Sequence, residues 1–359
     1  MARIALLAEG LFTPFDAKTA VGVLRYREPE VVAVIDSTRR GTDAATALGM
    51  DIGRGVPVVG GVAEALSGKP DTLVLGITPG NDRLYPRYRE EVLAAIAAGL
   101  DVHSGLHFQL AEDPEIAAAA RASGVRLWDV RRPPEGRRVA RLLPRRSGNH
   151  TVLAVGSDGS VGKMTTMLEL HRAARHTGLR SAFLATGQTG ILIAGAGLPA
   201  DAVVSDFLAG AVEEKVVELA ARADWTFVEG QGALNHPAYS AVALGIMHGA
   251  LPDALILCHI PGSTVINGWP ECPIPPLDRV VRMNEDAAGW LRPDGSPVVG
   301  ISLLTWGMSE RDAVAAIRAT EDATGLPTTD VVRFGADPLL AAVARHRGEV
   351  ARRRAEATA

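Results

Sequence analysis

Residues 151–166, with the sequence TVLAVGSDGSVGKMTT, are the part of the chain that most limits how it can fold. An apolar run suited to a buried strand leads into a loop with glycines, and Gly162 and Lys163 then open a helical stretch. Glycines allow several backbone N–H groups to turn inward around an anion, the start of the helix adds its dipole, and Lys163 adds a positive charge. The segment predicts a strand, a phosphate-binding loop and a helix, in that order.

Strand-type runs alternate with Ala-rich helical runs along the rest of the chain, a pattern typical of a parallel sheet with helices on both faces. Residues 131–150 interrupt it with seven Arg and three Pro. We therefore predict an α/β protein with two doubly wound, mainly parallel sheets. The expected parts are a Rossmann-like domain over residues 1–130, a basic linker over 131–150 and a P-loop NTPase-like domain over 151–359. The strands expected in the first domain are residues 3–8, 31–35, 72–77, 100–103 and 125–128.

Composition excludes several classes of protein. The net charge is −4, so the basic excess of a nucleic-acid-binding protein is missing. No stretch approaches 18 uninterrupted apolar residues, and the opening MARIALLAEG has the pattern of a core strand and not of a cleaved signal, so no membrane segment is expected. Two cysteines, Cys258 and Cys272, have no zinc-type spacing. We expect a cytoplasmic homo-oligomer that acts on a small molecule and has no metal site.

The loop differs from the common phosphate-loop pattern at two positions. Ser157 stands where that pattern has its first glycine, and Met164 stands where a Ser or Thr hydroxyl normally ligates Mg²⁺. A thioether is a poor ligand for magnesium, so phosphate binding is better supported than metal-assisted phosphoryl transfer. The pattern G-x-D-x-x-V-G-K resembles that of dethiobiotin synthetase and its relatives. The residues expected to bind the cofactor are Ser157, Asp158, Gly159, Ser160, Gly162, Lys163, Thr165 and Thr166.

Three further segments follow expected strands, at the edge where open α/β sheets bind ligands. Residues 186–190, TGQTG, could be a flexible turn or could bind a polar ligand. Residues 204–207 contain Asp206, which could be functional or could only favour a helix start. Residues 225–237 carry Glu229, followed by glycines, and His236, and each could accept a proton or have a structural role.

The whole chain also resembles a bacterial and archaeal family long labelled a domain of unknown function, with a Rossmann-like first half. Five of its motifs stand here: GKMTT at 162–166, TGQTG at 186–190, VVSDF at 203–207, VEGQG with HPAYS at 228–232 and 236–240, and NGWP with PIPP at 267–270 and 273–276. Residues 151–347 alone resemble the dethiobiotin-synthetase-like fold. A characterised branch of the family, the DgcN-type enzymes, acetylates D-glutamate, and the resemblance implies that activity for this chain.

On this basis we expect an acyltransferase that moves acetyl from acetyl-CoA to the amino group of an acidic amino acid, D-glutamate. The expected catalytic residues are Glu229, His236 and Asp206, and the expected substrate-binding residues are Gln188, Thr189, Gln231 and Asn267. Two alternatives stay open: a Mg-ATP-dependent kinase or ligase, and a non-catalytic nucleotide-binding switch. The first domain has no G-x-G-x-x-G after its first strand, which argues against nicotinamide binding, and its turn at residues 77–82 gives only a weak ligand signal.

Overall fold

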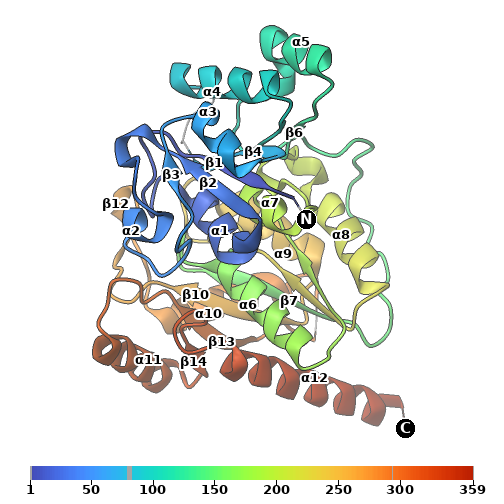
Figure 1. The fold of residues 1–359 in the computed structure, drawn as a ribbon. Coiled ribbons are helices and arrows are strands. Elements are labelled where there is room, and N and C mark those ends of the chain that lie inside the picture. The colour runs from blue at the N-terminus through green and yellow to red at the C-terminus, as the bar shows by residue number, and fades with distance from the viewer. Residues whose placement is uncertain (1, 79–82, 293, 359) are drawn as a thin grey trace. The chain divides into compact units, whose positions relative to one another are not determined.

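The computed structural model describes residues 2–78, 83–292 and 294–358, and the chain forms two compact units. The first contains Met1–Pro133 together with Gln188–Ala202, and the second contains Pro134–Gly187 together with Val203–Ala359. The short stretch from Gln188 to Ala202 therefore leaves the second unit and returns to it, which the sequence did not predict. Each unit is built on its own sheet (Figure 1).

The sheet of the first unit has six described strands in the order β3-β2-β1-β4-β5-β6, all parallel. This order, with β1 between β2 and β4, is that of the Rossmann fold, and it confirms the predicted fold class. The strands are β1 (Ile4–Leu7), β2 (Val31–Ile35), β3 (Val58–Val59), β4 (Thr72–Leu75), β5 (Asp101–Ser104) and β6 (Leu127–Asp129). The two-residue strand β3 was missed because so short a run carries no periodicity.

The helices of the first unit begin and end where local chemistry favours it. At α5, the Asp113 side chain accepts hydrogen bonds from the N–H groups of Glu115 and Ile116, Pro114 is the first helical residue, and Gly124 ends the helix with φ 68°. The helices are α1 (Lys18–Arg27), α2 (Ala44–Leu48), α3 (Val62–Ala65), α4 (Pro86–Ala97), α5 (Pro114–Ser123) and α7 (Gln188–Ala194), with 3₁₀ turns at Glu28–Glu30, Ser37–Arg39, Leu66–Gly68, Leu110–Glu112 and Ala200–Ala202.

Two backbone N–H groups of the loop after β1 already have an acceptor within the first unit. The buried Asp36, which follows β2, accepts hydrogen bonds from the N–H groups of Gly10 (3.1 Å) and Phe12 (3.2 Å). A dinucleotide would need free N–H groups at this place, so the contact agrees with the missing glycine motif. Residues 79–82 of the turn noted after the third expected strand lie outside the described residues.

The second unit has its own parallel six-stranded sheet in the order β14-β13-β10-β7-β9-β8, again counting described strands. The strands are β7 (His150–Gly156), β8 (Ser181–Leu184), β9 (Trp225–Val228), β10 (Ala254–His259), β13 (Val298–Leu303) and β14 (Thr328–Thr329). An antiparallel hairpin of β11 (Val265–Ile266) and β12 (Trp269–Pro273) follows β10. Every residue of β7 is buried, as expected of a central strand covered on both faces.

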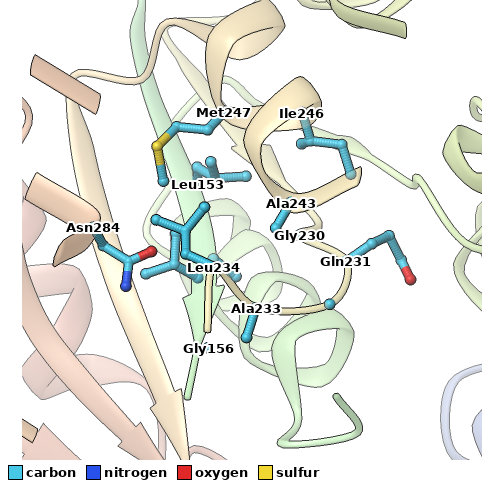
Figure 2. Close-up of a pocket in the computed structure, with 13 residues that line it drawn as sticks. Leu153, Gly156, Gly230, Gln231, Ala233, Leu234, Ala243, Ile246, Met247 and Asn284 are labelled. Carbon is cyan, nitrogen blue, oxygen red and sulfur yellow. The ribbon is translucent and has the colours of Figure 1, made fainter. Parts of the chain in front are cut away.

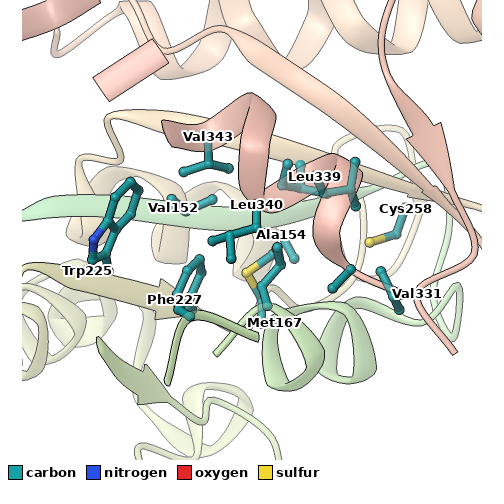
Figure 3. Close-up of a cluster of buried hydrophobic side chains, with 14 of the residues drawn as sticks. Val152, Ala154, Met167, Trp225, Phe227, Cys258, Val331, Leu339, Leu340 and Val343 are labelled. Carbon is teal, nitrogen blue, oxygen red and sulfur yellow. The ribbon is translucent and has the colours of Figure 1, made fainter. Parts of the chain in front are cut away.

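Helices cover both faces of this sheet. Alternate residues of β7 show this directly, since Val152 and Ala154 pack with Met167 and Leu339 (Figure 3), whereas Leu153 lies on the face of α9. The helices are α6 (Lys163–His176), α8 (Ser205–Ala220), α9 (Ser240–Ala250), α10 (Leu277–Gly289), α11 (Glu310–Thr324) and α12 (Asp337–Thr358). None of the described helices is both long and apolar enough to cross a membrane.

The segment expected as a basic linker is fixed to the second unit from Pro134 onward. The buried Glu213 carboxylate of α8 accepts hydrogen bonds from the N–H groups of Arg141 and Leu143, both at 2.9 Å. A Cβ on Gly210 would lie 1.9 Å from the carbonyl oxygen of Arg138, so only glycine fits where the segment crosses α8. The backbone of this segment is therefore held against α8, while most of its side chains are exposed.

Candidate functional site

The loop between β7 and α6 presents a row of free donors. Gly162 precedes α6 with φ 95°, a conformation that glycine adopts easily. Among the described residues, no acceptor lies against the backbone N–H groups of Val161, Gly162, Lys163, Met164 and Thr165. These N–H groups belong to the loop and the first turn of a 14-residue helix, where the helix dipole favours an anion. We call these five N–H groups the amide nest.

Lys163 adds the positive charge that the sequence predicted, and it does so from a buried position. Its ammonium donates to the carbonyl oxygen of Asp158 at 2.8 Å, within the same loop. Burial lowers the pKa of Lys163 to about 8, while the nearby Cys258, Asp158 and Glu229 act in the opposite direction. A buried ammonium whose pKa is lowered gains from a bound anion, so Lys163 and the nest form one anion-binding unit.

Two hydroxyl groups expected to bind the cofactor are turned into the core. Ser157 is fully buried and its hydroxyl lies 2.8 Å from Nδ1 of His259. The hydroxyl of Thr166 donates to the Gly162 carbonyl at 3.0 Å and to the Ser302 hydroxyl at 2.8 Å. Thr165 is half-buried at the start of α6.

The tip of the loop and the residue after Lys163 are more accessible than these hydroxyls. Gly159 is half-buried, Ser160 is exposed, and Met164 is half-buried in the first turn of α6. No group of three or more His, Cys, Asp and Glu side chains suited to a metal ion occurs within the described ranges.

Asp158 connects the loop to the hairpin that follows β10. Its carboxylate accepts hydrogen bonds from the N–H groups of Gly159 at 2.5 Å and Asn267 at 2.8 Å. Asn267 therefore contacts the loop through its backbone N–H, while the residue as a whole is exposed. Nε2 of His236 lies 3.7 Å from the same carboxylate. The buried side chain of Asp158 thus contacts three segments of the chain.

Glu229 lies directly after β9 and is 4% exposed. One carboxylate oxygen accepts from the N–H groups of Thr186 (2.9 Å) and Gly187 (3.3 Å), and the other accepts from the Gln231 side chain at 3.0 Å. Burial raises the pKa of Glu229 to about 7, although these donors and Lys163 lower it. The carboxyl group can therefore take up or release a proton near neutral pH.

Two glycines make room for this carboxylate. A Cβ on Gly187 would lie 2.7 Å from the Gln231 amide nitrogen and 3.1 Å from a Glu229 oxygen. A Cβ on Gly230 would lie 1.9 Å from the Ala154 carbonyl oxygen and 3.3 Å from Cδ of Lys163. The side chain of Lys163 thus runs past the residue that follows Glu229.

His236 is almost fully buried and both its ring nitrogens face partners. Nδ1 accepts a hydrogen bond from the N–H of Ala238 at 3.1 Å, so the ring proton of neutral His236 is on Nε2, toward Asp158. Burial lowers its pKa. The ring also contacts Tyr239 and Trp269, with centroids 4.5 and 4.7 Å away. His236 is suited to hold Asp158 and the hairpin in place, and less to accept a proton.

Three predicted site residues belong to helices other than α6. Asp206 is exposed in the first turn of α8, and Val204, not a polar residue, precedes that helix. Gln188 and Thr189 open α7 and belong to the first compact unit. The hydroxyl of Thr189 is 2.8 Å from the hydroxyl of Thr19 in that unit.

A small pocket lies behind the backbone of residues 230–234, on the face of the sheet covered by α9 and α10. Figure 2 shows Leu153, Leu234 and Met247 turned toward one another there, with Asn284 contributed by α10, while Gln231 points away. The walls are mostly apolar, so the pocket supports the loop after β9 without offering charged groups.

Sequence reasoning missed several residues that shape the site. Asn235 donates to the Ser157 carbonyl at 2.9 Å, and Thr186 donates its hydroxyl to the Glu229 carbonyl at 2.8 Å. Trp269 lies in the hairpin, which was not expected as a strand pair. One signal was available: each of these residues follows a strand of a parallel sheet, where such sheets bind ligands.

Comparisons with known proteins agree on one family. The profile described as the DUF1611 P-loop domain of unknown function matches residues 138–340, and the DUF1611_N Rossmann-like profile matches 37–133. A curated protein from Tritonibacter scottomollicae named D-glutamate N-acetyltransferase is 37% identical over 91% of this chain and 94% of its own length. A protein of the same name from a Pseudoalteromonas species is 34% identical over 78% and 83%.

The fold has a similar solved relative. The crystal structure of a DUF1611 family protein from Anabaena variabilis is 42% identical to this chain, with a TM-score of 0.89. The alignment covers 96% of this chain and 100% of that one. The likeness therefore extends over both units of the fold.

Proposed function

The chain belongs to the DUF1611 family, and from that premise we propose that it transfers the acetyl group of acetyl-CoA to the α-amino group of D-glutamate. Two relatives bearing the name of that activity align with most of the chain. The observation that supports the proposal best is Glu229, a buried carboxyl group with a pKa near 7 beside an anion-binding unit. A base of this kind assists acetylation of an amine that is protonated near neutral pH.

Glu229 accepts the first proton. The α-amino group of a free amino acid is an ammonium near neutral pH and has no lone pair for attack. An ionised Glu229 takes one proton from it, and a base whose pKa lies near the working pH does this efficiently. Such assistance contributes roughly 100- to 10,000-fold in rate.

The amine nitrogen then attacks the thioester carbonyl carbon, so that a C–N bond forms and the C–S bond breaks. The coenzyme leaves as its thiolate and takes the second amine proton, which gives the amide, the free thiol and protonated Glu229. Negative charge develops on the carbonyl oxygen during attack. Within the described chain, the N–H groups of Gly230, Gln231 and Gly232 have no acceptor and are our candidates to stabilise that charge.

Other site residues position the groups that react. His236 holds Asp158, and Asp158 fixes the loop and the hairpin through Gly159 and Asn267. Gln231 and the N–H of Gly187 fix the direction of the Glu229 carboxylate. Fixed geometry of this kind lowers the barrier because little reorganisation is left for the reaction step.

Purified protein with acetyl-CoA and D-glutamate tests the proposal, with free thiol and N-acetylglutamate as the two readouts. We expect equal amounts of both products, formation that persists in a metal chelator, and a lower rate with L-glutamate. A parallel reaction with MgATP and D-glutamate measures ADP. Magnesium-dependent ADP release without thiol release would replace the acetyltransferase by a kinase or ligase, and binding of either nucleotide without any product would favour a switch.

A further inference from the structure

We infer that the amide nest and Lys163 bind the α-carboxylate of the amino-acid acceptor and not the phosphates of the coenzyme. The inference rests on the proposed acetyl transfer, and it names the ligand of one part of that site. It also assigns to this chain a use of the phosphate-type loop that differs from the one its sequence pattern predicts.

The first observation is the short separation between the anion-binding unit and the base. The Lys163 side chain passes the position of a Gly230 Cβ at 3.3 Å, and Gly230 directly follows Glu229. Lys163 and Glu229 also influence each other's pKa, which requires that their charges be close. An anion bound by Lys163 is therefore within electrostatic reach of the Glu229 carboxyl group.

This separation fits an amino acid more directly than it fits coenzyme A. In an α-amino acid the nitrogen and the carboxylate carbon share one carbon atom and lie about 2.5 Å apart. A carboxylate held by Lys163 thus brings the ammonium to Glu229. In acetyl-CoA the thioester is separated from the pyrophosphate by an arm about as long as four extended residues, roughly 14 Å. Phosphates in the nest would bring the thioester to Glu229 only if this arm folded back on itself.

The charges at the site also favour an amino acid. Among the described residues that bond to one another around the loop, Lys163 is the only cation, whereas Asp158 and Glu229 are both acids and the pKa of His236 is lowered. The α-carbon of an amino acid carries one carboxylate and one ammonium group. With the carboxylate on Lys163, the ammonium faces the two acids. Several phosphate charges would face two buried carboxyl groups with one lysine to offset them.

Met164 supports the same conclusion. Phosphate chains in loops of this type are commonly shared between the lysine and a magnesium ion held by the hydroxyl at this position. Here Met164 supplies a thioether, which magnesium does not favour. A single carboxylate carries one charge and is neutralised by Lys163 and the N–H groups alone.

Steady-state kinetics of the full chain separate the two ligands. In Lys163→Met, which keeps the length of the side chain, we expect the KM for D-glutamate to rise roughly 10- to 100-fold, the effect of losing a charged hydrogen bond. The KM for acetyl-CoA should change less than about threefold. Lys215→Met is the matched control, because Lys215 pairs with Glu218 on the surface of α8, and both KM values should stay unchanged.

A second measurement needs no variant and so does not depend on Lys163→Met folding. The wild-type protein is assayed with 4-aminobutanoate, which keeps an amine and a distant carboxylate but has no α-carboxylate. We expect its kcat/KM to lie at least about 10-fold below that of D-glutamate. Equal use of both acceptors, or a rise in the acetyl-CoA KM alone in Lys163→Met, would overturn the inference and return the loop to the coenzyme.

Calorimetry distinguishes a failure of this inference from a failure of the proposed function. D-glutamate alone is titrated into the wild type and into Lys163→Met. Binding to the wild type that weakens 10-fold or more in the variant supports the carboxylate site even where no acetylation occurs, and then only the proposed reaction is lost. Acetylation of D-glutamate with equal binding to both proteins would leave the reaction in place and remove the carboxylate site.

Discussion

Two groups of buried charge lie at opposite ends of the second sheet, and their partners differ. At the start of β10, Asp253 accepts hydrogen bonds from the N–H of Thr151 at 2.7 Å and from Arg292 at 2.5 Å, with Arg145 at 3.5 Å. Burial alone would raise the pKa of Asp253, but the charges of Arg145 and Arg292 hold it below the usual value. The acid at this end is ionised and balanced by its neighbours.

At the other end the balance is incomplete. Burial outweighs the donors around Glu229 and raises its pKa, while the pKa of Lys163 is lowered. The N–H groups of the amide nest have no acceptor among the residues that the structure describes. Both ends hold buried acids and bases in one sheet. A buried charge that is balanced by other residues of the fold contributes to stability. A buried charge that is not balanced in this way marks a place where a ligand of opposite charge can bind.

The comparison is tested most strongly at Glu229. We expect Glu229→Gln to lower kcat for acetyl transfer roughly 100- to 10,000-fold, since the amide still accepts the N–H groups of Thr186 and Gly187 but cannot take up a proton. Thermal unfolding should show no loss of stability, because the substitution removes a buried charge. Glu218→Gln, at a surface pair with Lys215, is the control and should keep full activity.

The pH profile sharpens this prediction. The Glu229 carboxyl group must be ionised to act as a base, so kcat/KM should fall about tenfold per pH unit below pH 7. It should level off above pH 7 and fall again above about pH 8, where Lys163 loses the proton with which it binds the substrate carboxylate. An unchanged rate in Glu229→Gln, or a wild-type rate that climbs steadily to pH 9, would mean that the enzyme takes the free amine from solution without Glu229.

At the Asp253 end of the sheet we expect a substitution to lower the free energy of unfolding and to leave the acetyl-transfer reaction unchanged. In Asp253→Ala the guanidinium groups of Arg145 and Arg292 keep their burial but lose the carboxylate, which costs about 3–5 kcal/mol in the free energy of unfolding. Urea denaturation measures this. Asp51→Ala removes a highly exposed pair with Arg54 and should change stability by less than about 0.5 kcal/mol. Equal effects of the two substitutions would contradict the structural role of the buried group.

Gly230→Ala tests whether the backbone beside Glu229 can move. The new Cβ would meet the Ala154 carbonyl oxygen at 1.9 Å, so backbone must move, and we expect a cost of about 1–3 kcal/mol together with reduced activity. Gly289→Ala is the control, since a Cβ there meets nothing within 4 Å and alanine is the better helix former. A Gly230→Ala protein as stable and active as the wild type would show that the loop can shift freely.

The smallest effect is expected at Met164. Met164→Thr restores a hydroxyl at the position that ligates magnesium in related loops, and acetyl transfer should change less than about threefold. Magnesium-dependent binding of ATP, measured by calorimetry, should strengthen. A tenfold loss of acetyl transfer would instead place the thioether against a substrate.

The sequence predicted the parts of the fold that have a long periodic signal. Alternation of strands and helices was sufficient for both parallel sheets, and the strand over residues 31–35 was predicted with its observed bounds. The helix α9 was missed because its residues, SAVALGIMHGA, are apolar on almost every side. A Cβ on Gly245 or Gly249 would collide with α8, so α9 is buried against that helix and shows no polar face.

The site was predictable in its strand-end residues and not in their contacts. Lys163 and Glu229 follow β7 and β9, and parallel strands bring such residues to one edge. Asp206, which could have favoured a helix start, lies in the first turn of α8, but no side chain caps that helix. The position of His236 in the sequence could not show that its Nδ1 accepts a hydrogen bond from the N–H of Ala238. That contact depends on the local turn formed by the two residues after His236.

The excursion of Gln188–Ala202 has a consequence for how the chain is made. Helix α7 packs against α1, yet it is synthesised after β7 and β8 of the other unit. A ribosome that has released residues 1–133 has not yet supplied the last piece of the first unit. Early folding of an isolated amino-terminal half, the usual order in proteins of several domains, therefore stays incomplete until residue 202 emerges. A continuous fragment that ends at Pro133 therefore lacks residues 188–202, which complete the first unit.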